Sequence, residues 1–210
     1  LLAAALTEKG WEMTDSASEA DVVVINTCSV RDHAEQRVLS HLGHLQHLKK
    51  SRPHLLVAVI GCMAQRLGSR LLEHPTVDIA AGPEQLHQVP QLIQEALGDR
   101  RKHLAVTEAI RRPAGTKERL ELNEELDEFE RTYDSDRNHL KSQAFIRVMR
   151  GCNNFCSFCI VPYVRGPEIS RPPKAILEQA QKLAAQGIQQ ITLLGQTINS
   201  YRYSEGDRTY

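Results

Sequence analysis

The sequence predicts an α/β fold: an N-terminal α/β domain with a mostly parallel sheet, and a second unit that opens with strand, helix and strand. Two runs of β-branched apolar residues, 20–28 and 54–62, are typical of strands buried on both faces. An amphipathic helical pattern follows each run. The strand–helix–strand order then starts again near residue 143. Such alternation is characteristic of a parallel sheet covered by helices.

The elements of the N-terminal domain follow one another closely. The strand "ADVVVINTC" (20–28) precedes a helix over 33–51, whose apolar stripe includes Val38, Leu42 and Leu45 and whose last turn carries lysines. The remaining predicted elements are a strand over 54–62, a short helix over 65–75, a short strand over 77–83 and a closing helix over 88–99.

The stretch 99–141 separates the two units. It is crowded with charge, as in "TKERLELNEELDEFER", and predicts an interdomain linker with a short solvated helix near 120–129. A disordered insertion is the alternative. Beyond it we expect a strand leading into Cys152, a helix over 172–187 and a strand over 188–196. The predicted domains are therefore 1–98 and 142–210, joined by the linker 99–141.

The composition is that of an ordinary globular protein, with 41% hydrophobic and 25% charged residues and a formal net charge of zero. A purely electrostatic nucleic-acid binder is usually more basic, so composition alone does not predict one. No apolar run approaches the roughly 18 residues of a membrane span, and no basic leader precedes the apolar start. We therefore expect a cytoplasmic protein that does not enter the membrane. Because the chain begins at Leu1 and stops soon after the second strand of its second unit, we expect truncation at both ends.

Three of the five cysteines crowd one loop: Cys152, Cys156 and Cys159 form a C-x3-C-x2-C pattern. Zinc is one alternative, but a structural zinc site wants four protein ligands, and no further Cys or His follows nearby. A disulfide scaffold is disfavoured by the expected compartment. Three thiolates on one short loop suit a [4Fe–4S] cluster whose fourth iron stays open for another ligand.

The other two cysteines, Cys28 and Cys62, each follow a predicted strand directly. The carboxyl ends of parallel strands form the ligand-binding edge of open α/β sheets, so these two thiols are expected at one rim. The alternative is that both are small buried hydrophobic residues, a common role for free cysteine.

The cysteine loop, placed after a strand that opens a βα unit, resembles the radical S-adenosylmethionine (radical SAM) superfamily. The segments "MRGCNNFCSFCIVPYVRG", "DVVVINTCSVRDHAEQRV" and "GCMAQRLG" together resemble the methylthiotransferase family, and most closely its tRNA-modifying branch. This resemblance implies that the second unit is the start of a radical SAM partial (β/α) barrel. It also implies a cluster on Cys152, Cys156 and Cys159 whose open iron binds SAM and, once reduced, splits it to a 5′-deoxyadenosyl radical.

The resemblance assigns further residues. Phe158 matches the aromatic position near the SAM adenine, with a core residue as the alternative. Gln196 and Asn199, in "LLGQTINSY", stand where a SAM-binding stretch is usual, although ordinary polar loop residues are the alternative. Cys28 and Cys62 match two of three ligands of a second [4Fe–4S] cluster, whose remaining cysteine is expected upstream of Leu1. No catalytic residue is assigned.

The implied reaction transfers a methylthio group to C2 of N6-isopentenyladenosine at position 37 of the tRNA anticodon loop, a base that can be splayed from its stack. An electron donor such as flavodoxin or ferredoxin and a monomeric enzyme are implied as well. Four arginines flank the cysteine loop and are expected to meet phosphate or the SAM carboxylate, with a solvated or ion-paired surface arginine as the alternative for each: Arg147, Arg150, Arg165 and Arg171.

The sequence departs from the family at "VRGPEISRPP", where Pro167 replaces an expected basic residue. Two alternatives remain at this stage. One is a methylthiotransferase that acts on a ribosomal-protein aspartate or on threonylcarbamoyladenosine. The other is a non-catalytic protein, either an iron–sulfur carrier or a zinc-stabilised binding module, which would need a fourth ligand near Cys159.

Overall fold

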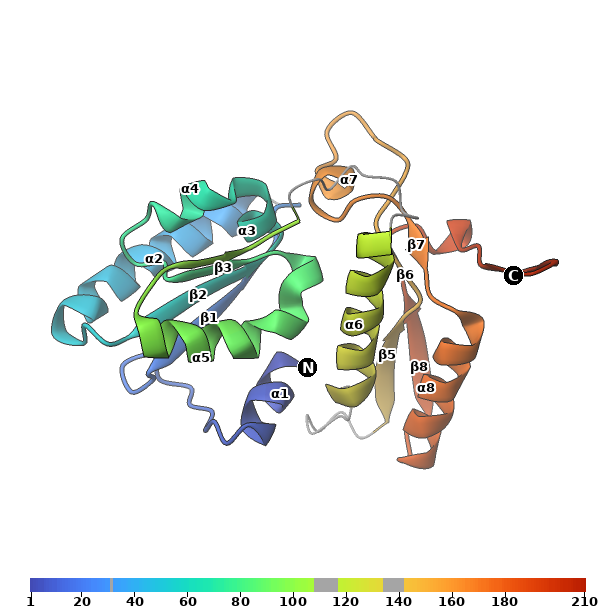
Figure 1. The fold of residues 1–210 in the computed structure, drawn as a ribbon, viewed down its shortest axis with the longest axis horizontal. Coiled ribbons are helices and arrows are strands. Elements are labelled where there is room, and N and C mark those ends of the chain that lie inside the picture. The colour runs from blue at the N-terminus through green and yellow to red at the C-terminus, as the bar shows by residue number, and fades with distance from the viewer. Residues whose placement is uncertain (31, 108–116, 134–141) are drawn as a thin grey trace.

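The computed structural model describes residues 1–30, 32–107, 117–133 and 142–210, and both of its units mix helices with strands (Figure 1). The N-terminal unit contains α1 (Leu2–Glu8), β1 (Val22–Thr27), α2 (Asp32–Ser51), β2 (Leu56–Gly61), α3 (Cys62–Leu67), α4 (Ser69–Leu72), β3 (Ile79–Ala81), the 3₁₀ helix η1 (Pro83–Gln88), α5 (Val89–Asp99) and β4 (His103–Ala105). The predicted α/β class with a parallel sheet is confirmed.

The four strands of this unit form one parallel sheet in the order β1-β2-β3-β4. Alternate side chains of β2 point to opposite faces: Val57 and Val59 pack with α2, α3 and α4, whereas Ala58 and Ile60 pack with α1 and α5. Because both faces are covered, β2 is apolar along its whole length, which is the pattern that predicted it.

Two details of this unit differ from the expected elements. The helix predicted over 65–75 begins earlier and is split into α3 and α4 at Gly68, whose φ of +54° is unfavourable for residues with a side chain. Strand β4 lies inside the stretch expected to be linker, and it was not predicted. It has three residues and no β-branched side chain, so its sequence carries almost no strand signal.

The second unit is smaller. It comprises β5 (Gln143–Arg147), β6 (Met149–Arg150), α7 (Val161–Val164), β7 (Ile169–Ser170), α8 (Pro173–Ala185), β8 (Gln190–Leu194), the 3₁₀ helix η2 (Ile198–Ser200), β9 (Ser204–Glu205) and β10 (Arg208–Thr209). Strands β5 and β8 pair in parallel, and α8 covers one side of them as the crossover helix. Ile146, Met149 and Leu183 form the centre of its core.

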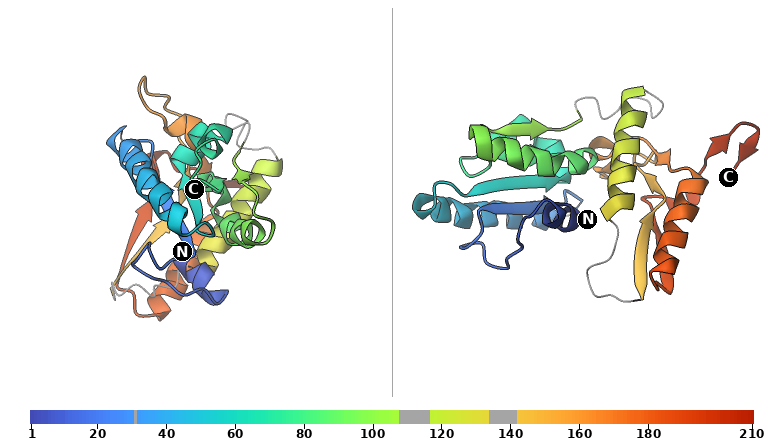
Figure 2. Two further views of the ribbon diagram at one scale, coloured as in Figure 1. Left: turned by 90° about the vertical axis from the view of Figure 1, so that its left-hand side faces the viewer. Right: turned by 60° about the horizontal axis from the view of Figure 1, so that its bottom comes forward.

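Helix α6 (Lys117–Tyr133) stands between the two units in Figure 1 and in the right-hand view of Figure 2. It covers the short helix expected near 120–129, but this helix is solvated on one side only. Leu126 and Phe129 are buried, because they recur at helical spacing and face the N-terminal unit. The rest of the charged stretch, at 108–116 and 134–141, lies outside the described residues. Among the described helices, none is long and apolar enough to cross a membrane.

Candidate functional site

The cysteine loop is closed at its base by a short antiparallel hairpin between β6 and β7, in which Arg150 pairs with Ile169. Gly151 has a φ of +71°, and a Cβ atom there would lie 2.0 Å from the carbonyl oxygen of Pro167. The next residue, Cys152, donates its backbone N–H to the carbonyl of Gly166 at 3.0 Å. The hairpin thus brings its two strands so close that only glycine fits before the first cysteine.

The three loop cysteines differ in exposure. Cys152 is buried, and its Sγ lies 3.2 Å from Oγ1 of Thr197, which follows β8 and directly precedes η2. Cys156 is exposed and Cys159 is half-buried; a turn joins them, with the N–H of Cys159 donating to the carbonyl of Cys156 at 3.0 Å. None of the five cysteines forms a disulfide. The first thiol is therefore fixed against the strand ends, while the other two lie on the outer part of the loop.

Two phenylalanines accompany these thiols. Phe158 is 95% exposed, so the alternative that it is a core residue is excluded. Phe155 adopts a left-handed backbone with a φ of +43°, which is uncommon for a residue with a large side chain, and it contacts Tyr163 edge-on at 6.1 Å between ring centroids. Both phenylalanines are thus exposed apolar side chains within the segment that carries the three thiols.

The donor set of this loop fits an iron–sulfur cluster. Three unpaired thiols on eight consecutive residues supply the soft ligands that such clusters require. Within the described residues, no three His, Cys, Asp or Glu side chains are already gathered closely enough to hold a metal ion. The fit therefore lies in the chemistry and spacing of the donors.

Cys28 and Cys62 lie at the carboxyl ends of the neighbouring parallel strands β1 and β2, as the sequence predicts. Thr27 joins the two strand ends: its hydroxyl donates to the carbonyl of Ile60 at 2.6 Å and accepts the N–H of Met63 at 3.2 Å. Gly61 has a φ of +95°, and a Cβ there would lie 2.6 Å from the Thr27 carbonyl oxygen. This close approach was not predicted, because it depends on two residues that are far apart in the sequence.

A pocket of about 230 Å³ lies between the two units at this edge. Cys62 lines it from the N-terminal unit, and Arg150, Arg165 and Gln196 line it from the second. Of the predicted site residues, the pocket therefore brings Cys62 and Gln196 together. Its lining does not include Cys28, Phe158, Asn199 or the three loop cysteines, and Asn199 is exposed on η2. The side-chain oxygen of Gln196 is buried there without a hydrogen-bond partner.

Two carboxylates of α6 meet three of the arginines that flank the cysteine loop. Glu130 accepts hydrogen bonds from Arg147 Nε and Arg150 Nη2, both at 2.9 Å. Asp127 pairs with Arg147 and lies 3.4 Å from Arg171 Nε. For these three arginines the alternative of ion pairing within the protein is correct, although the pairs are largely buried rather than at the surface. Arg165 is the fourth of the set, and it lines the pocket.

The pKa values reflect this burial. Burial by itself raises the pKa of Glu130, but the positive charges of Arg150 and Arg147 outweigh it, so the pKa falls below its usual range. Burial, and then the neighbouring charge of Arg147, lowers the pKa of Arg150 to about 10. Sequence reasoning missed Asp127 and Glu130. Their spacing of three residues, in and just after the helix predicted near 120–129, was the available signal, and it resembled that of an ordinary solvated face.

Pro167, where the sequence departs from the family pattern, lies among the contacts that close the base of the cysteine loop. Asn153 and Glu168 bridge the loop reciprocally: the N–H of Asn153 donates to Glu168 Oε1 at 3.3 Å, and the N–H of Glu168 donates to Asn153 Oδ1 at 3.1 Å. The carbonyl oxygen of Pro167 forms part of the tight contact with Gly151. The proline thus contributes backbone to the base of the loop.

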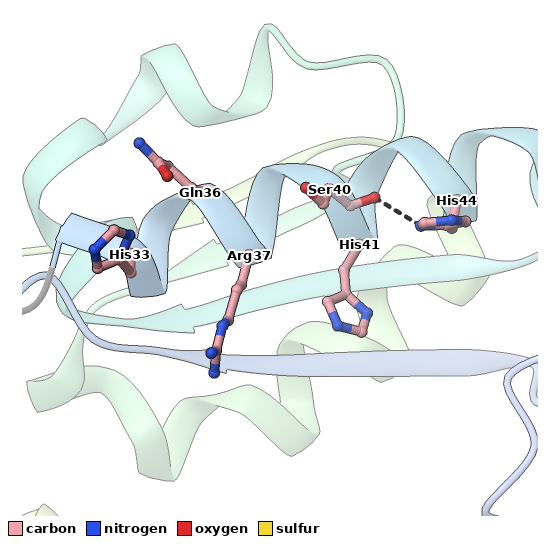
Figure 3. A pocket seen from close by; sticks show the side chains of 6 residues that line it. All are labelled: His33, Gln36, Arg37, Ser40, His41 and His44. Carbon is pink, nitrogen blue, oxygen red and sulfur yellow. Dashed lines mark hydrogen bonds between the residues drawn. The ribbon is translucent and has the colours of Figure 1, made fainter.

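A second hollow lies on the outer face of α2, lined by His33, Gln36, Arg37, Ser40, His41 and His44 (Figure 3). His44 Nδ1 donates to the carbonyl of Ser40 at 3.0 Å within the same helix. All of the lining comes from one helix, and none from a cysteine-bearing strand end. This hollow is therefore separate from the candidate site.

Comparison with known proteins gives matches to two separate segments of the chain. Residues 1–82 match the family described as "Uncharacterized protein family UPF0004", and residues 146–208 match the radical SAM superfamily. Proteins named tRNA-2-methylthio-N(6)-dimethylallyladenosine synthase are among the relatives. The one from Syntrophus aciditrophicus is 40% identical over 95% of this chain and 40% of its own length. Those from Bordetella avium and Syntrophotalea carbinolica are 40% and 38% identical, over 93% and 94% of this chain and 38% and 42% of their own lengths.

The chain therefore spans about two fifths of the length of these relatives. The radical SAM match contains all three cysteines of the C-x3-C-x2-C loop, and the superfamily implies SAM and a [4Fe–4S] cluster. The UPF0004 match contains Cys28 and Cys62. The chain is therefore homologous to proteins named tRNA-2-methylthio-N(6)-dimethylallyladenosine synthase, and in it a UPF0004 segment precedes a radical SAM segment.

Proposed function

We propose that this chain carries part of the catalytic apparatus of a tRNA methylthiotransferase, which places a methylthio group on C2 of N6-isopentenyladenosine at position 37 of tRNA. The observation that carries the proposal is the free C-x3-C-x2-C loop within the radical SAM segment, in a chain whose relatives are named for this reaction. Cys152, Cys156 and Cys159 are the proposed ligands of the first cluster. With SAM bound, this cluster supplies radical chemistry strong enough to activate an aromatic C–H bond.

The protein's own part in this reaction is to hold the cluster and to orient and shield SAM. Burial of Cys152 against Thr197 anchors one end of the loop, and the exposed Phe158 offers a flat apolar surface beside Cys159 for the SAM adenine. Gln196 and Asn199 are the further proposed SAM contacts. The buried, unpartnered oxygen of Gln196 supports the first of these, because such a group is costly unless a ligand or water donates to it.

A second [4Fe–4S] cluster is proposed at the sheet edge. Cys28 and Cys62 contribute two of its ligands, and a further cysteine comes from outside these 210 residues. The position of Cys62 supports this second cluster. Cys62 lines the pocket between the units, so a cluster bound there would face the second unit. The proposed partners are the tRNA anticodon loop and a reduced flavodoxin or ferredoxin. The enzyme is proposed to act as a cytoplasmic monomer.

The test is anaerobic reconstitution of the protein with iron and sulfide, followed by reduction of the reconstituted protein in the presence of SAM. We expect 5′-deoxyadenosine to form, and we expect the Cys152→Ala/Cys156→Ala/Cys159→Ala variant to lose about four iron atoms per chain, one cluster's content. The matched variant Cys28→Ala/Cys62→Ala should still cleave SAM. Binding of a single zinc, without iron and without SAM cleavage, would overturn the proposal.

A further inference from the structure

Helix α6 contacts both units through two different faces. Its apolar face packs on the N-terminal unit, where Leu126 and Phe129 are buried with Ala5 of α1 and against Leu86 of η1. At the edge of this face, Glu125 lies 3.1 Å from His87 of η1. Figures 1 and 2 show the helix standing between the parallel sheet and strand β5. The helix is thus attached to the N-terminal unit mainly by apolar burial.

An adjacent face of α6 is acidic and holds the second unit by ion pairs. Asp127 and Glu130 are only 17% and 15% exposed, and their partners Arg147 and Arg150 are buried to a similar degree. Arg171, the third partner, is 2% exposed and also donates to the carbonyl of Arg147 at 2.7 Å. Because the groups on both sides of the contact are shielded from water, removing the carboxylates deprives the buried guanidinium groups of the negative charges that they pair with.

The ion pairs lie next to the cysteine loop. Arg150 is the last residue of β6, and only Gly151 separates it from Cys152. Gly151 is wedged against the backbone of Pro167, so the chain here has little room to absorb a displacement. A shift of Arg150 toward solvent is therefore transmitted to the buried first thiol of the loop.

We propose that Asp127 and Glu130 are positioning residues: acting through Arg147, Arg150 and Arg171, they hold the cysteine loop against the pocket that Cys62 lines. Both carboxylates belong to a helix that is packed on the N-terminal unit. The same contact therefore sets where the loop lies relative to the sheet edge of that unit. The inference rests on the proposed function in that it takes the loop thiols as cluster ligands.

The experiment measures the rate at which each cysteine of the apo chain is alkylated, by mass spectrometry under native conditions. In the Asp127→Asn/Glu130→Gln variant we expect alkylation of Cys152 to accelerate about tenfold through easier local opening, while that of Cys62 stays unchanged. Cys62 serves as the internal control, because general unfolding would expose it together with Cys152. Glu128→Gln is the matched control variant, since it removes one carboxylate from an exposed position on the same helix. It should leave both rates unchanged.

The proposal would be overturned if Cys152 of a folded double variant were alkylated no faster than that of the wild type. It would also be overturned if alkylation of Cys62 accelerated as much as that of Cys152. If the double variant does not fold, Asp127→Asn alone retains Glu130, and the same selective acceleration, though smaller, is expected. Iron reconstitution separates this inference from the proposed function. Failure of the wild-type chain to bind iron contradicts the function, whereas normal binding with unchanged Cys152 protection contradicts only the positioning role.

Discussion

Replacement of Gly151 by alanine tests whether the hairpin contact builds the base of the cysteine loop. Two costs add at this position. A residue with a side chain in the left-handed region costs about 1–2 kcal/mol. The new Cβ would also lie 2.0 Å from the Pro167 carbonyl oxygen and 2.6 Å from that of Gly166, both of them backbone atoms that cannot rotate away. Forcing extra volume into a packed site costs about 1–3 kcal/mol more, so we expect a total of about 2–5 kcal/mol.

Gly187→Ala is the control that isolates the steric part. Gly187 also has a left-handed backbone, with a φ of +90°, but a Cβ added there would have no atom within 4 Å beyond its own chain neighbours. It should therefore lose only the conformational cost, about 1 kcal/mol at a position following a helix. Urea unfolding followed by circular dichroism, together with iron content after reconstitution, measures both variants. If Gly151→Ala is no less stable than Gly187→Ala and binds iron equally well, the close contact at the loop base is not a constraint.

Other contacts lead to three further predictions. Leu126→Ala should destabilise the attachment of α6 to the N-terminal unit by about 2–5 kcal/mol, because it opens a cavity among buried apolar side chains; urea unfolding would contradict this if the midpoint did not move. Asp78 accepts the N–H of Val57 at 2.7 Å and pairs with Lys49 at 2.5 Å. Asp78→Ala should cost about 3 kcal/mol in urea unfolding, because the Val57 N–H loses its acceptor and Lys49 keeps only the Thr76 carbonyl; a loss under about 1 kcal/mol would show that water replaces the carboxylate. The pKa of Glu130 is lowered in the folded protein, so its contribution to stability is complete above its ordinary pKa of about 4.3 and is lost as the pH falls through the folded value. The Glu130→Gln variant should accordingly lose less stability than the wild type between about pH 5 and the acid range, as measured by urea midpoints at each pH; parallel losses would contradict the sign.

The sequence allowed the sheet edge to be predicted because the relevant information is local. The runs that form β1 and β2 are apolar for most of their length, and each ends one residue before Cys28 or Cys62, so their place at a common edge follows from parallel pairing alone. The short strand β4 escaped prediction for the opposite reason: its three residues are held by pairing with β3 rather than by their own preferences.

The acidic face of α6 shows what local patterns cannot convey. In the sequence, Asp127 and Glu130 belong to a charged run, and the arginines that they meet begin 17 positions beyond Glu130. Whether such a carboxylate is solvated or buried depends on how the two units pack. A sequence segment of a few residues carries no information about that packing. The same holds for Thr27, whose hydroxyl joins the ends of β1 and β2 across the sheet.

The arrangement of α6 has a consequence for how the protein can be divided into pieces. A cut just before β5 would follow the apparent border of the second unit, yet it would remove both α6 carboxylates from Arg147, Arg150 and Arg171. In the resulting fragment, the guanidinium groups of these three arginines would lie beside the base of the cysteine loop without their carboxylate partners. A cut before Lys117 would keep the carboxylates but expose Leu126 and Phe129 to water. Neither cut yields a second unit that keeps its ion pairs and also keeps the apolar face of α6 buried. Helix α6 is therefore a structural part of both units.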